Sequence, residues 1–179
     1  MKFIETEIKD LWEIEPEVYR DQRGYFLESY QLEKLQSVGI NGPFVQDNQS
    51  YSSKGVLRGL HYQQKPFQQG KLVSVTVGKV LDIVVDIRQS SPTFGSYYSC
   101  ILDAVKHNIL YVPEGMAHGF LALENSVFVY KCTQFYHKES EKGILWNDPQ
   151  LEIEWGITDP IVSEKDKALP LFQEVMEKL

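Results

Sequence analysis

The middle of the chain alternates apolar and polar residues with the period of β-strands. Apolar side chains occupy every second position of residues 81–87, while Asp82 and Asp86 fall on the opposite face. Residues 73–77 alternate in the same way, and Gly78 separates the two segments. Because successive side chains of a strand point to opposite faces, the pattern predicts a strand, a turn and a second strand.

Short strand-like segments continue on both sides of this pair. They are residues 25–30, 44–48, 57–63, 97–102, 108–112, 119–123 and 127–135. Turn-forming runs separate them, such as Ser91–Gly95 and Pro113–Gly115. Many strands at close spacing predict an all-β fold, an antiparallel sandwich or barrel, rather than alternating strands and helices.

Helical spacing is confined to two short segments. Leu32, Leu35 and Gln36 indicate a short helix before Gly39. Apolar residues at positions 171, 172, 175, 176 and 179 indicate a C-terminal helix after Pro170, a residue well suited to the first turn. We expect this last helix to close one end of the barrel.

Composition narrows the class of protein. A chain of 179 residues with 42% hydrophobic and 24% charged residues is typical of one globular domain, here residues 1–179. The net charge of −7 gives no general attraction to nucleic acids or anionic membranes, and no apolar run reaches membrane-spanning length. Two cysteines and the lack of an N-terminal apolar run favour a reducing, cytoplasmic location.

His61 stands out among the four histidines. It lies inside the predicted strand 57–63, three residues after Arg58. Strict alternation would place these two side chains on opposite faces, unless Gly59 hosts a β-bulge that turns both inward. From the residues alone, a hydrogen-bonded core histidine and a functional one are both open interpretations.

A metal site is hard to assemble from this sequence. Jelly-roll barrels often bind a metal through two histidines two residues apart, but the position two after His61 is Gln63. No other pair of histidines is closely spaced. Three nitrogen or oxygen ligands at one site are therefore not evident, and we expect no metal. His118 on its own is more typical of a structural turn residue.

A few polar side chains on predicted strands could bind an anionic ligand. Arg23, Arg58 and Lys71 suit contacts with phosphate or an oxyanion. More commonly, such residues are ordinary surface side chains whose aliphatic part covers apolar surface while the charged end stays in solvent. Further polar residues on or beside predicted strands are Glu28, Gln46, Asn48, Tyr130 and Tyr136.

Nine segments together resemble the dTDP-4-dehydrorhamnose 3,5-epimerase family. In order, they are residues 21–29, 44–48, 55–63, 69–73, 85–88, 91–95, 113–120, 143–148 and 163–166. They span nearly the whole chain. Two departures are Gly156, where the family usually has proline, and Tyr19, where phenylalanine is common.

The resemblance implies a fold and an activity. The family has a cupin-type jelly roll with short peripheral helices, works as a homodimer and uses no cofactor and no metal. It converts dTDP-4-keto-6-deoxy-D-glucose to dTDP-4-dehydro-L-rhamnose in dTDP-L-rhamnose synthesis, by proton transfer next to a ketone. The implied partners are thus a dTDP-sugar and a second copy of the chain, with no nucleic acid and no membrane.

The resemblance also implies roles for individual residues. His61 corresponds to the general base, Asp166 to its partner, Tyr130 to the general acid and Lys71 to the residue that stabilises the enolate oxygen. Ligand-contacting positions correspond to Arg23, Phe26, Glu28, Gln46, Asp47, Asn48, Arg58, Lys71, His118, Tyr136, Glu141 and Lys165.

Three alternatives stay open at this point. A dTDP-sugar 3,4-ketoisomerase on the same fold would act on the same kind of substrate and would not need Tyr130. A single-carbon epimerase would invert only one of the two centres. A non-catalytic sugar-binding jelly roll would need no pairing of His61 with Asp166.

Overall fold

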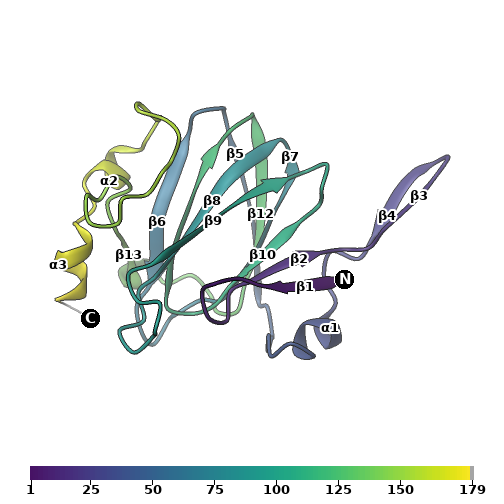
Figure 1. Cartoon of the computed structure of the whole chain (residues 1–179), viewed down its shortest axis with the longest axis horizontal. Helices are drawn as coiled ribbons and strands as arrows, with labels where there is room; N and C mark the ends of the chain where they lie inside the picture. The colour runs from purple at the N-terminus through teal and green to yellow at the C-terminus, as the bar shows by residue number, and fades with distance from the viewer. Residues whose placement is uncertain (178–179) are drawn as a thin grey trace.

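Two antiparallel sheets pack face to face in the computed structural model, which describes residues 1–177 (Figure 1). The six-stranded sheet has the order β1 (Lys2–Glu5), β2 (Trp12–Glu15), β10 (Ile109–Val112), β7 (Lys71–Val77), β12 (Ser126–Cys132), β5 (Gln46–Ser52). The five-stranded sheet has the order β13 (Glu141–Gly143), β6 (Leu57–Gln63), β11 (Met116–Ala122), β8 (Lys79–Asp86), β9 (Tyr97–Asp103). This arrangement confirms the predicted jelly-roll class.

The space between the sheets is filled by the inward-facing residues of each strand. Val80 and Val84 of β8 pack there against Val73 of β7 and Phe128 of β12, and all four are buried. The alternate residues of β8, such as Ile83, face the other way and are buried too. The strand is thus covered on both faces, and its two-residue period sorts its side chains between two apolar layers.

The second apolar layer lies on the outer face of the five-stranded sheet. The chain after β13 runs over this face and forms α2 (Glu164–Lys167) and α3 (Phe172–Met176) (Figure 1). Phe172 and Val175 of α3 are buried against the residues of this layer. The expectation that the last helix closes an end of the barrel was therefore wrong: the helix buries its apolar side chains against the outer face of the five-stranded sheet. Position 179 of the predicted helix lies outside the described residues.

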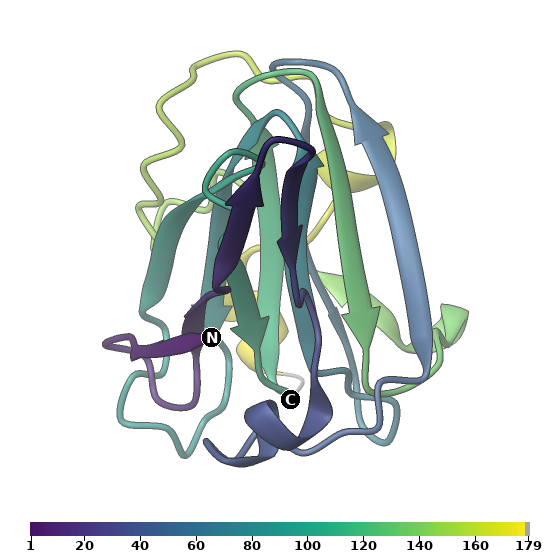
Figure 2. The same ribbon diagram turned by 90° about the vertical axis from the view of Figure 1, so that its right-hand side faces the viewer.

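A hairpin of β3 (Val18–Asp21) and β4 (Gly24–Leu27) projects from the opposite side of the molecule (Figure 1). Figure 2 looks onto that side, with the dark hairpin in front of the sheets. Its aromatic side chains are largely exposed: Phe26 is 66% accessible, and Tyr25 contacts the ring of His107 at a centroid distance of 4.5 Å. The hairpin thus presents apolar surface that the chain itself does not cover.

The remaining elements are short. α1 (Leu32–Gln36) forms before Gly39 as predicted and buries Leu35, and a 3₁₀ turn, η1 (Lys138–Ser140), precedes β13. The sequence did not predict β1, β2, β3 or β13, which are strands of only three or four residues. Cys100 and Cys132 are both free. No helix in residues 1–177 has the length and apolarity to cross a membrane.

Candidate active site

A cavity of about 540 Å³ lies between the two sheets and is lined by both polar and apolar side chains. One wall comes from β6 and β11 of the five-stranded sheet, and the facing wall comes from β7 and β12 of the six-stranded sheet. α2 closes one side. The cavity brings together seven residues that the sequence singled out: Arg58, His61, Lys71, His118, Tyr130, Lys165 and Asp166.

A β-bulge at Gly59 explains how Arg58 and His61 reach the same cavity. On β11, His118 pairs with His61 and Phe120 pairs with Arg58, so two residues of β6 lie opposite the single Gly119. Gly59 has φ +120°, and a Cβ there would lie 2.6 Å from the Cα of Gly119. Only glycine allows this backbone and this close approach. The bulge considered in the sequence is therefore present.

His61 forms a hydrogen-bonded pair with Asp166. The His61 Nε2 atom lies 2.8 Å from Asp166 Oδ1, and the carboxylate is buried while the imidazole is partly accessible. An ionised carboxylate can only accept, so Nε2 carries the proton and Nδ1 keeps the lone pair of a neutral ring. The pair therefore has the composition of a histidine base with a carboxylate that fixes its tautomer.

The position of Asp166 is fixed by the turn that carries it. Ser163 caps α2 by accepting a hydrogen bond from the Asp166 backbone N–H, at 3.1 Å. The Gly59 N–H also points at Asp166 Oδ2, at 3.4 Å. Burial alone would raise the pKa of Asp166, but the hydrogen bonds from His61 and from the Gly59 N–H, together with nearby positive charge, outweigh it and lower that pKa below its usual value.

Tyr130 and Lys71 occupy the facing wall. Tyr130 comes from β12 and Lys71 from the neighbouring β7, with the Lys71 Nζ atom 5.9 Å from the centre of the Tyr130 ring. Burial raises the pKa of Tyr130, so its hydroxyl keeps its proton. Burial lowers the pKa of Lys71, although nearby acidic groups oppose this shift. A phenol hydroxyl and an amine thus face the His61–Asp166 pair across the cavity.

His118 has a second buried carboxylate behind it. Asp82 of β8 is fully buried, and its two oxygens lie 2.9 and 3.0 Å from His118 Nε2. The sequence interpretation of His118 as a turn residue was wrong, since it lies within β11 and lines the cavity. Asp82 was not among the predicted site residues. The signal was present, because an aspartate amid the apolar residues of a strand buried on both faces requires a partner.

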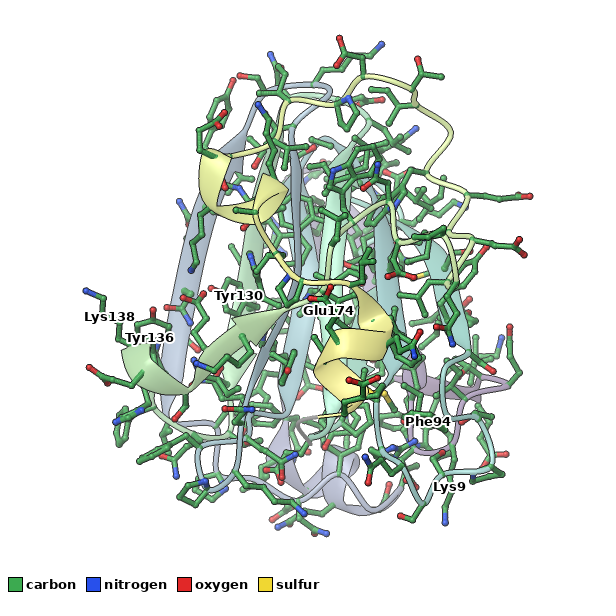
Figure 3. All side chains as sticks on the ribbon, turned by 90° about the vertical axis from the view of Figure 1, so that its left-hand side faces the viewer. Lys9, Phe94, Tyr130, Tyr136, Lys138 and Glu174 are labelled. Carbon is green, nitrogen blue, oxygen red and sulfur yellow. The ribbon has the colours of Figure 1, made fainter. Side chains whose placement is uncertain are left out.

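A smaller cavity of about 260 Å³ adjoins the first and shares His61, Lys71 and Tyr130 with it. Its other predicted residues are Gln46, Asn48, Tyr136 and Glu141. Tyr130 and Tyr136 lie on the same side of the molecule, which Figure 3 shows from the side of α2 and α3. Glu141 accepts hydrogen bonds from the Tyr136 hydroxyl at 2.9 Å and from Lys165 at 2.5 Å. These bonds tie the wall of this cavity to α2.

Arg58 presents a fixed guanidinium at the cavity. Its Nε donates to Ser52 Oγ at 3.0 Å, and its Nη2 donates to the Tyr51 carbonyl at 3.1 Å. The side chain is exposed enough for a ligand to reach it. A guanidinium held in this way is suited to a phosphate oxygen.

Four predicted ligand-contacting residues do not reach either cavity. Asp47 is on the outer face of β5 and pairs with Lys131 at 2.8 Å. Arg23, Phe26 and Glu28 lie on or just after the projecting hairpin, where Arg23 pairs with Asp21. Within one chain, these residues are therefore separate from the site.

Among residues 1–177, no group of three or more histidine, cysteine, aspartate or glutamate side chains is arranged to hold a metal ion. Gln63 occupies the position at which a metal-binding barrel would have a second histidine. It faces the smaller cavity, and its buried Oε1 atom has no hydrogen-bond partner among the described residues.

Comparisons with known proteins agree with one another. Residues 5–174 match the family model described as dTDP-4-dehydrorhamnose 3,5-epimerase. The dTDP-4-dehydrorhamnose 3,5-epimerase of Shigella flexneri is 51% identical over 93% of both chains. A crystal structure of the enzyme so named from Elizabethkingia anophelis superimposes with a TM-score of 0.94 at 49% identity, covering 97% of each chain. The crystal structure of a 3,5-epimerase from Legionella pneumophila, solved with dTDP-4-keto-L-rhamnose, superimposes with a TM-score of 0.92 at 48% identity, covering 96% of this chain and 93% of the other.

Proposed function

The chain belongs to the dTDP-4-dehydrorhamnose 3,5-epimerase family, and from this membership we propose that it converts dTDP-4-keto-6-deoxy-D-glucose to dTDP-4-dehydro-L-rhamnose. The observation that carries the proposal is the pairing of His61 with Asp166 on one wall of the cavity and Tyr130 on the facing wall. Inverting a carbon centre requires proton removal on one face and proton delivery on the other, which suits two opposed walls.

The ketone at carbon 4 acidifies the hydrogens on carbons 3 and 5, because the carbanion formed at either carbon delocalises onto oxygen as an enolate. His61 Nδ1 takes the proton, and Asp166 stabilises the imidazolium that forms. The Lys71 ammonium stabilises the negative charge on the enolate oxygen. The Tyr130 hydroxyl then delivers a proton to the opposite face of the same carbon.

The remaining residues bind the rest of the substrate. Arg58 contacts the diphosphate, and Lys165 lies on the adjoining side of the same cavity. His118 contacts the sugar. The smaller cavity accommodates the nucleoside, with Gln46, Asn48, Tyr136 and Glu141 along its wall.

A homodimer accounts for the predicted contacts that one chain does not provide. The hairpin with Arg23 and Phe26 projects away from its own cavity and exposes aromatic surface. In the proposed assembly, the hairpin of one protomer packs against its partner and brings Arg23, Phe26 and Glu28 to the partner's substrate. Sedimentation velocity tests this assembly: a dimer is expected, and replacement of Phe26 by glutamate is expected to weaken it, because a charge enters an apolar contact.

The reaction needs no cofactor and no metal in this proposal, and the protein acts in the cytoplasm as a domain spanning residues 1–179. Gln63 occupies the position at which a metal-binding barrel would have a second histidine. Turnover is therefore expected to continue in EDTA. Loss of turnover in EDTA, restored by zinc or iron, would contradict the metal-free mechanism.

The decisive experiment incubates the enzyme with dTDP-4-keto-6-deoxy-D-glucose in heavy water and follows each carbon by NMR. A 3,5-epimerase introduces deuterium at carbons 3 and 5 and yields the L-rhamno product. Inversion at one carbon would identify a single-carbon epimerase, and absence of label at carbon 5 would favour a 3,4-ketoisomerase. Binding without label at either carbon would identify a non-catalytic sugar-binding protein.

A further inference from the structure

Asp82 is the one aspartate on the inner face of β8 that contacts a residue of the candidate site. Asp86, four residues later on the same face, accepts hydrogen bonds from Arg88, Ser91 and Thr93 instead. Both carboxyl groups are fully buried. A buried carboxyl group costs several kcal/mol, roughly, unless it is paired. Asp86 is paired within a turn, and Asp82 is paired with His118.

The geometry of this pair indicates which atom carries the proton. His118 Nε2 is almost equidistant from the two oxygens of Asp82, at 2.9 and 3.0 Å. One N–H shared between two carboxylate oxygens has this geometry, whereas a protonated carboxyl would give one short bond from the oxygen that carries the hydrogen. Burial raises the pKa of Asp82, and His118 and the charge of Lys71 only partly offset that rise, so the two distances carry the assignment of the proton to Nε2.

A proton held on Nε2 leaves Nδ1 as the second polar atom of the His118 ring. Among the residues that the structure describes, none forms a hydrogen bond with Nδ1, and the ring lines the larger cavity. A neutral ring with this tautomer offers a lone pair, which accepts a hydrogen bond from a hydroxyl group and repels a carbonyl oxygen.

We propose that Asp82 is a positioning residue: it fixes His118 in the Nε2–H tautomer, so that Nδ1 accepts a hydrogen bond from a hydroxyl group of the bound sugar. The part that concerns the sugar rests on the proposed function, since a 4-keto-6-deoxy sugar carries hydroxyl groups next to its ketone. Asp82 itself does not line the cavity. Its effect on the ligand passes through His118.

The first test reads the tautomer in the ligand-free wild-type protein. Histidine labelled with ¹⁵N and observed by long-range ¹H–¹⁵N correlation distinguishes a protonated from an unprotonated ring nitrogen, and His118→Gln assigns the signal. We expect Nε2 protonated and Nδ1 unprotonated at pH 7.5. A proton on Nδ1 would overturn the proposal, whether or not the protein proves to be an epimerase.

The second test replaces Asp82 by asparagine, which keeps the shape but can donate through its amide and so release the tautomer. The KM for the 4-keto sugar is expected to rise about tenfold, the value of one hydrogen bond, with kcat changed less than about threefold. Asp86→Asn is the matched control, with the same burial and strand but no contact with His118. It is expected to lower stability and to leave both KM and the His118 signals unchanged.

A double variant separates positioning from a general structural effect. If Asp82 acts through His118, then Asp82→Asn should raise KM no further once His118 is alanine. An additional rise in KM in the double variant would contradict the proposal. So would an unchanged KM in Asp82→Asn alone, or a fall in kcat with KM unchanged.

Discussion

His61 and His118 are direct cross-strand partners on β6 and β11, and each has a buried carboxylate at its Nε2 atom. The two pairs differ in access: the His61 side chain is 28% exposed and the His118 side chain 8%. The more accessible ring, His61, is the better candidate for a base, because a base must contact the bound substrate. The more enclosed ring is the better candidate for a fixed contact.

Replacement of His61 by alanine tests the proposed base. We expect kcat to fall by about 10²–10⁴-fold, the usual contribution of a general base, and deuterium exchange at carbons 3 and 5 to fall with it. Binding of dTDP, measured by calorimetry, should stay within about threefold of wild type, because the base acts on the sugar. Near-normal exchange would place the base elsewhere.

Replacement of Tyr130 by phenylalanine keeps the ring and deletes its proton. His61 can still form the enolate and return a proton from its own side, so solvent deuterium should enter at carbon 5 without inversion. Tyr111→Phe is the control, since Tyr111 lies on β10 of the same sheet and outside both cavities of the site. Inversion of carbon 5 at the normal rate in Tyr130→Phe would show that another group is the acid.

Charge reversal at Arg58 tests the diphosphate contact. Arg58→Glu replaces an attraction with a repulsion, and we expect the Kd for dTDP to rise about 10- to 100-fold at low salt. Lys106→Glu changes the overall charge equally at an exposed turn between β9 and β10. An equal effect of both variants would mean that only the net charge matters.

The bulge at Gly59 should be intolerant of any side chain. Gly59→Ala forces a residue with φ +120° and a Cβ 2.6 Å from Gly119, whereas Gly24→Ala imposes a similar φ of +127° with nothing within 4 Å. Backbone strain alone costs about 1–3 kcal/mol, so Gly24→Ala should lose about that much and Gly59→Ala clearly more. Urea unfolding gives both values. Equal losses would show that the close approach to Gly119 relaxes freely.

Acid should remove the stabilising contribution of Asp166. Its pKa is lower in the folded protein than in the unfolded chain, so the carboxylate stabilises the fold above the unfolded value, and this contribution disappears as the pH falls through the folded value. Asp166→Asn should therefore be less stable than wild type at pH 7, with the difference shrinking toward pH 3. The exposed Asp159→Asn serves as control. A difference independent of pH would mean that the amide costs packing rather than charge.

Alternation revealed the central strands because each must place apolar residues on a covered face. The strand 57–63 was predicted with its observed bounds, while β1 and β13 were missed because three or four residues at a sheet edge carry too few alternating positions. The same logic failed at Asp82. A polar residue opposite an apolar face usually meets water, but here the second sheet covers it, and only the three-dimensional arrangement reveals the partner.

Sequence order could not establish which candidates meet. Arg58 and His61 share a cavity because of one bulge, an outcome that strict alternation excluded. Arg23 belongs to the same predicted set of ligand-contacting residues, but within this chain it lies on the hairpin, away from the cavity. The cavity separates the residues that one chain brings together, such as Arg58 and His61, from those that lie away from it, such as Arg23.

Asp166 follows all of the strands in chain order, and this has a consequence for the timing of synthesis. A ribosome makes every strand of both sheets before it reaches α2. The exit tunnel covers the most recently added residues, so β12, β13 and α2 emerge together at the end of synthesis. His61 therefore gains its carboxylate partner only when the chain is nearly finished, and a polypeptide truncated before α2 would carry the imidazole without a fixed tautomer.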